Sequence, residues 1–173
     1  TIWAETIKQI HRHVPKCTVE VLTPDFQGDR LALKKVFDAK PEIFSHNVEC
    51  IERISRKVRA QAVWTRSLDV LKQSVVSGLR TKTGMMVGLG ESTKEVIETM
   101  KEVVDLGVEI FTIGQYLQPT KKHLPVLRYV EDEEFQIYKK IGLDLGFRVV
   151  ESGALVRSSY HADEQARLAK IEN

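Results

Sequence analysis

Residues 83–89, TGMMVGL, constrain the fold more than any other stretch, because they form an apolar run with no polar alternation. A strand with one face in water alternates polar and apolar residues, whereas a parallel strand covered on both faces does not. Helical or looping segments separate this run from four other short runs, at 17–22, 42–47, 109–114 and 147–151. Five strands connected in this way predict a parallel sheet with right-handed crossovers.

The intervening segments carry helical patterns. Apolar residues spaced along one face predict helices within 1–14, 30–40, 48–58, 68–79, 91–107 and 135–145. The clearest helix has a capping box from Ser92 and Glu95 and a stop at Gly107. Periodicity leaves two architectures open, a doubly wound sheet or a sector of a (β/α) barrel. In both, chemistry takes place at the carboxyl ends of the strands.

Composition predicts one domain, or part of a larger one, whose function depends on a local site. The chain has 173 residues, 42% of them hydrophobic, and its net charge of +2 gives no reason to expect nucleic acid or a membrane as partner. Cys17 and Cys50 lack a CxxC context, so neither a metal knuckle nor a disulfide is expected. A reducing compartment fits best. The chain starts without Met, apparently inside a helix, which indicates an excised fragment.

Two strand ends carry candidate ligand-binding groups. Asn47 and Glu49 follow the second run and offer an amide and a carboxylate to hydroxyl groups such as those of a ribose. Alternatively, Asn47 caps the next helix and Glu49 lies in its first turn. Gly88, Gly90 and Glu91 follow the third run, where glycines let a ligand approach the backbone. Alternatively, these glycines serve only the turn.

The fourth and fifth runs end in further polar groups. Gln115 and Tyr116 offer hydrogen bonds and a stacking face, although a structural tyrosine in a solvated loop is the alternative. The fifth run leads into the sequence RSSYH at 157–161. A serine activated by histidine would need a third group to orient the base, and the chain has no G-x-S-x-G elbow. A serine hydrolase is therefore not expected.

Several of these motifs, in order, resemble one family. FSHNVE, RSLDVL, TKTGMMVGLGE, TIGQYLQP and SGALVRSSYHAD, together with PDFQGD, are similar to the C-terminal two thirds of lipoyl synthases, which are radical S-adenosylmethionine enzymes. The resemblance runs from residue 1 to about residue 166. It implies a truncated sector of a partial (β/α) TIM-type barrel with parallel strands over residues 1–156. Residues 157–173 would form a C-terminal tail carrying the RSSYH motif.

The resemblance also implies an activity. Lipoyl synthases are sulfurtransferases that insert two sulfur atoms, at C6 and C8, into an octanoyl chain held on a lysine of a lipoyl carrier domain (E2 or H protein). They use two [4Fe-4S] clusters and S-adenosylmethionine, and an auxiliary cluster donates the sulfur. A ferredoxin or flavodoxin would supply electrons. We expect a bacterial cytoplasm, with a mitochondrion or plastid as the alternative, and neither nucleic acid nor membrane as a partner.

Site residues follow from the same resemblance, and none of them is assigned a catalytic role. The groups expected to contact the cofactor are Gly88, Gly90 and Glu91 for the adenosyl group, Asn47 and Glu49 for the ribose or methionyl part, Arg66 and Ser67 for the carboxylate, and Gln115 and Tyr116 for the adenine edge. Ser159 is expected to be an oxygen ligand of the auxiliary cluster, with Ser158 as second candidate, and Arg157 is expected near that cluster.

The chain departs from the family in one respect: it has neither a CxxxCxxC nor a CxxxxCxxxxxC motif. Three thiolates at short spacing hold such clusters, so both motifs are expected upstream of Thr1. The 173 residues alone are expected to form no complete cluster and to be inactive. We do not expect the RSSYH motif in other radical S-adenosylmethionine enzymes that insert sulfur, so this motif distinguishes lipoyl synthases from them. The remaining alternative is a (β/α) module that binds a nucleotide or S-adenosylmethionine without sulfur insertion.

Overall fold

The computed structural model describes residues 1–164. Its helices are α1 (Ile2–His13), α2 (Arg30–Asp38), α3 (Glu52–Val58), α4 (Trp64–Val76), α5 (Thr93–Asp105) and α6 (Asp132–Leu145), with a short 3₁₀ helix at Phe26–Gly28. Its strands are β1 (Glu20–Leu22), β2 (Ile43–Ser45), β3 (Arg80–Val87), β4 (Ile110–Gln115) and β5 (Val149–Gly153). Of the tail predicted at 157–173, residues 165–173 lie outside the described part.

Strand order decides between the two architectures that periodicity left open. The five strands are all parallel and lie in the order β1-β2-β3-β4-β5. When each right-handed crossover joins a strand to its next neighbour in the same direction, every crossover lies on the same face of the sheet. A doubly wound sheet would instead reverse its order and have helices on both faces. The fold is therefore a sector of a (β/α) barrel, as the resemblance implied.

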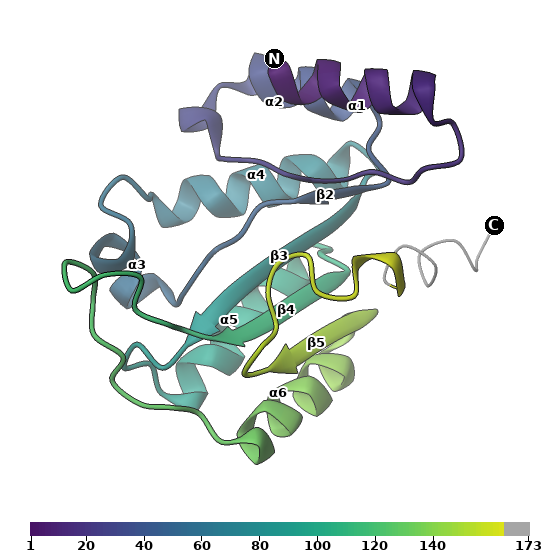
Figure 1. Cartoon of the computed structure of the whole chain (residues 1–173). Coiled ribbons are helices and arrows are strands. Elements are labelled where there is room, and N and C mark those ends of the chain that lie inside the picture. The colour runs from purple at the N-terminus through teal and green to yellow at the C-terminus, as the bar shows by residue number, and fades with distance from the viewer. Residues whose placement is uncertain (165–173) are drawn as a thin grey trace.

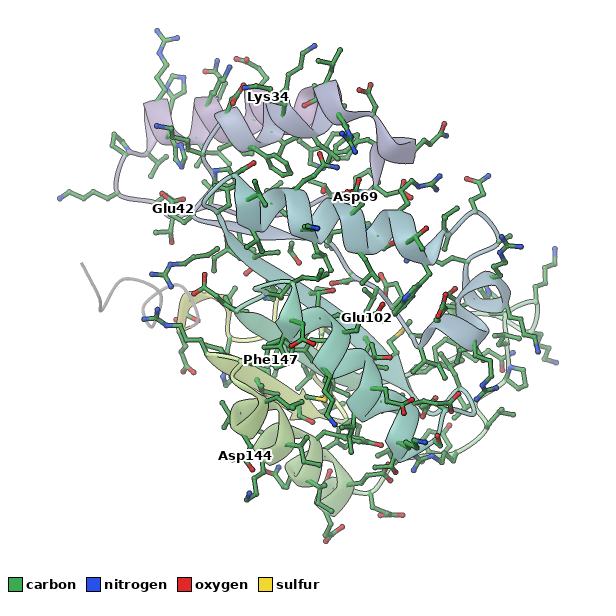
Figure 2. All side chains as sticks on the ribbon, turned by 180° about the vertical axis from the view of Figure 1, so that it is seen from behind. Lys34, Glu42, Asp69, Glu102, Asp144 and Phe147 are labelled. Atoms are coloured by element: carbon green, nitrogen blue, oxygen red, sulfur yellow. The ribbon has the colours of Figure 1, made fainter. Side chains whose placement is uncertain are left out.

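The figures show this one-sided arrangement. Helices α4, α5 and α6 cover the outer face of the sheet, and α1 and α2 continue that layer beside β1 and β2 (Figures 1 and 2). On the opposite, inner face, the segment that follows β5 crosses in front of the strands (Figure 1). The end of the described chain thus fills space that the rest of a closed barrel would enclose.

The two faces of the sheet are packed differently. The outer face forms the main core with the helices, around residues such as Phe111, Met100 and Tyr138. The inner face has a small apolar layer at the amino-terminal edge of the sheet and, beside it, the fully buried Lys82, whose Nζ lies 2.8 Å from the Glu20 carboxylate. Charged side chains are buried in this way only when they are paired. The inner face is therefore a polar interior.

The helix predicted over 48–58 is shorter than expected. Residues 48–50 are not helical, and α3 begins only at Glu52, with Ile51 as its N-cap and no side-chain cap. The alternative in which Asn47 caps this helix, with Glu49 in its first turn, is therefore wrong. Val48 and Ile51 are buried as expected, but they are buried as extended chain.

The capping box predicted for the fifth helix is confirmed. Ser92 and Glu95 form the reciprocal capping box at the start of α5. Cys17 is exposed, Cys50 is buried, and both are free thiols. Within the described residues, no helix has the length and apolar character needed to cross a membrane.

Gly142 gives a test of the packing between α6 and the sheet. A Cβ at Gly142 would lie 2.6 Å from Met100 Cε and 2.8 Å from Val150 Cγ2. Overpacking of a core costs about 1–3 kcal/mol, and alanine returns about 1 kcal/mol of helix propensity. We expect Gly142→Ala to destabilise the chain by up to about 2 kcal/mol in urea unfolding. Lys140→Ala on the exposed side of the same helix should cost about 0.5 kcal/mol or less, and equal costs would contradict this packing.

Candidate functional site

A bulge between β2 and β3 builds the centre of the candidate site. The pairing of the two strands stops after Ser45 and resumes at Glu49, which bridges to Met85. In the gap, the fully buried Thr83 hydroxyl donates to His46 O (2.8 Å) and accepts from Val48 N (3.2 Å). A side chain thus replaces the ladder bonds that the bulge interrupts, which a buried backbone requires.

The bulge contains two polar residues, Asn47 and Glu49, with unusual surroundings. Glu49 has a left-handed backbone (φ 70°), which costs a non-glycine residue energy and is seen mainly where the surrounding structure enforces it. Burial raises the pKa of its carboxyl group, and Arg59 and Asn47 oppose that shift. The side-chain Oδ1 of Asn47 is buried without a hydrogen-bond partner among the described residues. An unpaired buried acceptor of this kind suits a ligand donor.

Asn47 and Glu49 open into a cavity of about 150 Å³ at the carboxyl edge of the sheet. The cavity is lined from β3, β4 and the segment after β5, by Gly84, Met85, Met86, Thr112, Gly114, Gln115, Leu117, Val156, Arg157 and Ser158. Asn47 Nδ2 donates to Ser158 Oγ at 3.0 Å, although the two residues lie 111 positions apart. Liquid water takes up about 30 Å³ per molecule, so the cavity holds a sugar-sized group rather than a whole nucleoside.

The glycine-rich turn after β3 is held by its own acidic residue. The buried Glu91 carboxylate accepts hydrogen bonds from Gly88 N (2.7 Å) and Leu89 N (2.9 Å). Gly88 has φ 101°, and a Cβ there would collide with Gln115 and with the Arg128 carbonyl. The Gly88 and Leu89 amides are thus bonded within the turn, and Glu91 acts on the turn itself.

A strap formed by residues 117–130 supports this turn from the other side. Gln115 donates to Arg128 O (3.1 Å) and accepts from Val130 N (2.9 Å), while Tyr116 donates to Leu124 O (2.8 Å). The Arg128 guanidinium forms a two-bond ion pair with Glu134, which lowers the pKa of Glu134 to about 2. Gln115 lines the cavity, whereas the Tyr116 ring is buried.

Arg66 and Ser67 lie on α4, away from this cavity. Arg66 Nε contacts Asp25 Oδ2 at 2.5 Å beside an open cleft of about 810 Å³ that Arg59 also lines. Ser67 is buried, and its hydroxyl lies 3.0 Å from His46 Nε2. Of the predicted contacts, Asn47, Glu49 and Gln115 line the cavity and Arg66 lines the cleft. Neither space is lined by the other five, which are Ser67, Gly88, Gly90, Glu91 and Tyr116.

The two serines of the RSSYH motif have different surroundings. Ser158 is half-buried against Asn47, whereas Ser159 is exposed. Arg157 bonds to the carbonyls of Ala154 (3.3 Å) and Val156 (2.6 Å), which fixes the turn before the serines. The expectation that Ser159 is a cluster ligand stays a prediction, and in this structure Ser158 is the serine that faces the cavity.

The residues fit the two expected cofactors differently. Within residues 1–164, no group of three or more His, Cys, Asp or Glu side chains could hold a metal ion, so the described chain does not by itself provide an iron-sulfur site. Part of S-adenosylmethionine does fit. The unpaired Asn47 Oδ1 and the Glu49 carboxylate line a cavity that Gly84 and Gly114 also line.

The fold matches solved radical S-adenosylmethionine enzymes. A domain of a pyruvate-formate lyase-activating enzyme from Bacteroides vulgatus superposes with a TM-score of 0.67 at 12% identity, covering 87% of this chain and 89% of that one. Methylornithine synthase gives a TM-score of 0.64 at 11% identity, covering 91% of this chain and 53% of that one. Identities this low show the fold alone, which is the TIM-type barrel of the radical S-adenosylmethionine class.

Sequence similarity narrows the class to one family. The lipoyl synthase of Rubrobacter xylanophilus is 54% identical over 172 residues, which are 98% of this chain and 54% of that protein. The mitochondrial lipoyl synthase of Nematostella vectensis is 54% identical over 94% of this chain and 56% of its own length. No protein-family model matches the chain. The chain is therefore a homologue of lipoyl synthases and spans about half the length of these curated relatives.

Sequence reasoning missed Thr83 and His46. Thr83 stands in an otherwise apolar run, and a lone hydroxyl in a doubly covered strand is a signal that a backbone group needs a partner. His46 lies within the FSHNVE motif, and no local pattern indicates its contacts. It joins Thr23 O (3.0 Å) to Ser67 and so links β1 to α4.

Thr83 allows a direct test of the bulge. We expect Thr83→Val to lower the free energy of unfolding by about 2 kcal/mol or more, because it leaves His46 O and Val48 N buried without partners. Thr83→Ser keeps the hydroxyl and should cost about 1 kcal/mol. Urea unfolding gives the stabilities, and hydrogen exchange of the Val48 amide should accelerate only in the valine variant. Equal effects of the two substitutions would show that the Thr83 hydroxyl does not stabilise the bulge.

His46 predicts a pH dependence of stability. Burial lowers the pKa of His46, and the nearby Arg59 and Arg66 add to this while Asp25 opposes it. The unfolded chain, with an ordinary pKa of about 6.5, then binds a proton more readily than the folded chain. Stability should therefore fall as pH drops below about 6.5, by at most about 1.4 kcal/mol per pH unit. His46→Gln should be less stable at pH 7.5 but should show a shallower loss between pH 7.5 and 5.5. A parallel loss in both proteins would contradict the assignment.

Proposed function

We propose that this chain is the carboxyl-terminal part of the barrel of a lipoyl synthase, and that its sheet-edge cavity binds part of S-adenosylmethionine. The observation that carries the proposal is the 54% identity to lipoyl synthases across nearly the whole chain. The parent activity would be insertion of sulfur at C6 and C8 of an octanoyl chain carried on a lysine. S-adenosylmethionine, when bound, would supply the radical chemistry, and residues of the cavity and the cleft would hold part of it.

The geometry suggests which groups do the binding. Asn47 Oδ1 is a free buried acceptor and Glu49 is a carboxylate on the same bulge, so together they suit the two hydroxyls of a ribose. Contacts from Gly88, Gly90 and Glu91 to the adenosyl group stay part of the proposal on the family resemblance, since the Gly88 side of the turn is packed against Gln115 and the Arg128 carbonyl. Arg66 and Arg59 line the adjoining cleft and offer positive charge to a carboxylate.

The segment after β5 has a separate role in the proposal. Ser158 accepts a hydrogen bond from the side-chain amide of Asn47. The RSSYH turn therefore lies beside a residue that we propose binds S-adenosylmethionine. A serine oxygen from this turn, Ser159 as first candidate and Ser158 as second, would complete the auxiliary cluster whose thiolates come from other parts of the enzyme. The carrier domain and the electron donor belong to the same proposal.

Binding of S-adenosylmethionine by the 173-residue chain tests the cavity. We expect saturable binding in titration calorimetry and a roughly fivefold weaker affinity for Asn47→Ala, since a hydrogen bond is worth about 1 kcal/mol. Ser159→Ala, at an exposed position next to the cavity serine, should leave the affinity unchanged. A folded chain that binds neither S-adenosylmethionine nor 5′-deoxyadenosine would overturn the cavity assignment.

A chimaera tests sulfur insertion. Residues 1–164 of this chain would replace the matching segment of the Rubrobacter xylanophilus lipoyl synthase, and conversion of an octanoylated carrier domain would be followed by mass spectrometry. We expect both sulfur atoms to be inserted. A chimaera that binds S-adenosylmethionine and cleaves it without forming the sulfur product would favour the alternative of a radical or binding module with another task.

A further inference from the structure

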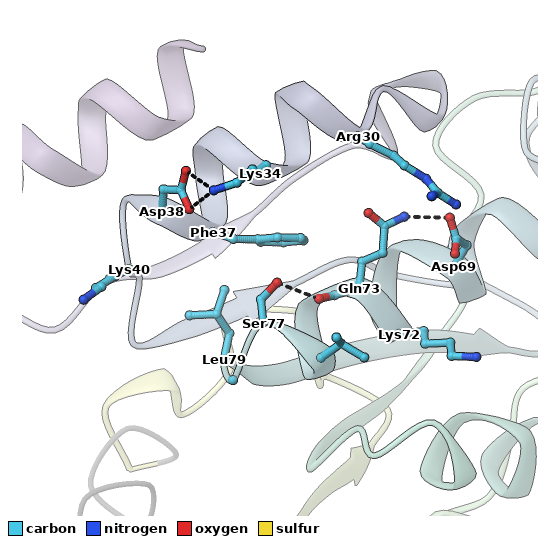
Figure 3. Close-up of a pocket in the computed structure, with 12 residues that line it drawn as sticks. Arg30, Lys34, Phe37, Asp38, Lys40, Asp69, Lys72, Gln73, Ser77 and Leu79 are labelled. Carbon is cyan, nitrogen blue, oxygen red and sulfur yellow. Dashed lines mark hydrogen bonds and ion pairs between the residues drawn. The ribbon is translucent and has the colours of Figure 1, made fainter.

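A second cavity lies in the helical layer, between α2 and α4. Its volume is about 760 Å³, and it shares no lining residue with the sheet-edge cavity or with the cleft beside Arg66. Figure 3 shows the two helices forming its walls, with side chains of both projecting into the space between them. Cavities that bind small molecules have volumes of roughly 300–1,000 Å³. We call this cavity the α2/α4 groove.

The middle of the α2/α4 groove is apolar. The Phe37 ring points between the helices (Figure 3) and is held by edge-to-face packing on Phe44, with ring centres 5.0 Å apart. Leu79 is half-buried below it, and Val76 on the rim is 79% exposed. A fixed aromatic ring with aliphatic neighbours is a ready surface for an apolar body.

The rim of the groove carries excess positive charge. Four cationic and two anionic side chains line it, and two of these six form an ion pair, Lys34 with Asp38 at 2.7 Å. The other carboxylate, of Asp69, accepts a hydrogen bond from Gln73. The three remaining cations, Arg30, Lys40 and Lys72, form no ion pair and no side-chain hydrogen bond within the part of the chain that the structure describes.

We propose that the α2/α4 groove binds an amphipathic organic anion. The apolar body of the ligand, a ring or a short chain, would rest on Phe37 and Leu79, and its carboxylate, sulfonate or phosphate would meet Arg30 or Lys72. Neither half is sufficient alone, because isolated exposed charges contribute little and an apolar body needs burial to gain free energy. The proposal does not depend on the proposed function, since the two sites share no residue.

Three probes separate the contributions of charge and apolar surface. Naphthalene-2-sulfonate carries both features, 2-naphthol carries the ring without charge, and sulfate carries the charge alone. We expect naphthalene-2-sulfonate to shift the backbone amide resonances of residues 30–40 and 72–79 saturably in ¹H–¹⁵N spectra. Its Kd should be at least about tenfold lower than that of either partial probe, which corresponds to about 1.4 kcal/mol.

Paired variants localise the binding. Lys72→Glu should weaken naphthalene-2-sulfonate at least about fivefold while changing 2-naphthol by less than about twofold. Val76→Glu should weaken both probes. The matched controls are Lys101→Glu on α5 and Ile137→Glu on α6, both at exposed positions, and they should leave every Kd unchanged. Thermal unfolding checks that all four variants fold.

Three outcomes would overturn the proposal. The first is a loss of binding in Lys101→Glu equal to that in Lys72→Glu, which would indicate a general field of positive charge. The second is sulfate or 2-naphthol binding as tightly as naphthalene-2-sulfonate. The third is a set of shifts outside the two groove segments.

Discussion

The hydroxyl of Thr83 is the interaction on which the candidate site depends most directly. It occupies a break in the ladder between β2 and β3 and satisfies one backbone carbonyl and one backbone amide there. Without it, the buried His46 carbonyl and Val48 amide would have no partner. A regular strand would place Asn47 and Glu49 on the same face, but it would not need the left-handed backbone of Glu49. The bulge therefore sets the backbone conformation from which Glu49 reaches the cavity.

The second support is the mutual bracing of the turn after β3 and the strap at 117–130. Glu91 binds the turn amides from inside, and Gln115 fixes the strap to the end of β4. The Leu127 amide donates to Gly88 O at 2.9 Å and closes the contact between the two segments. Buried, fully bonded polar networks of this kind hold a single backbone arrangement. Glu91 is thus more directly explained as the holder of the turn than as a ligand contact.

How much the sequence could predict depended on how local each signal was. The capping box at Ser92 is decided within four residues, so it was predicted correctly. The one-sided helical layer depends on strand order, which periodicity does not contain and which the resemblance supplied. Val48 and Ile51 misled the helix assignment because buried residues three apart fit a helical face, yet an irregular extended chain can bury the same two side chains. The contact between Asn47 and Ser158 joins residues 111 positions apart, and no local pattern could reveal it.

The segment after β5 can approach the candidate site because two positions on the inner face of the sheet, 84 and 114, are glycines. A Cβ at Gly114 would collide with the Val156 carbonyl, and a Cβ at Gly84 would collide with the Thr112 hydroxyl. The inner face of β3 and β4 is therefore shallow near its carboxyl edge, and the backbone after β5 can lie directly on it. Because the backbone lies directly on the sheet, Ser158 comes within hydrogen-bonding distance of Asn47, whereas the next residue, Ser159, is exposed. A larger side chain at position 114 would displace the Val156 carbonyl and with it the RSSYH turn that follows, so the position of the serines depends on this glycine as well as on the motif.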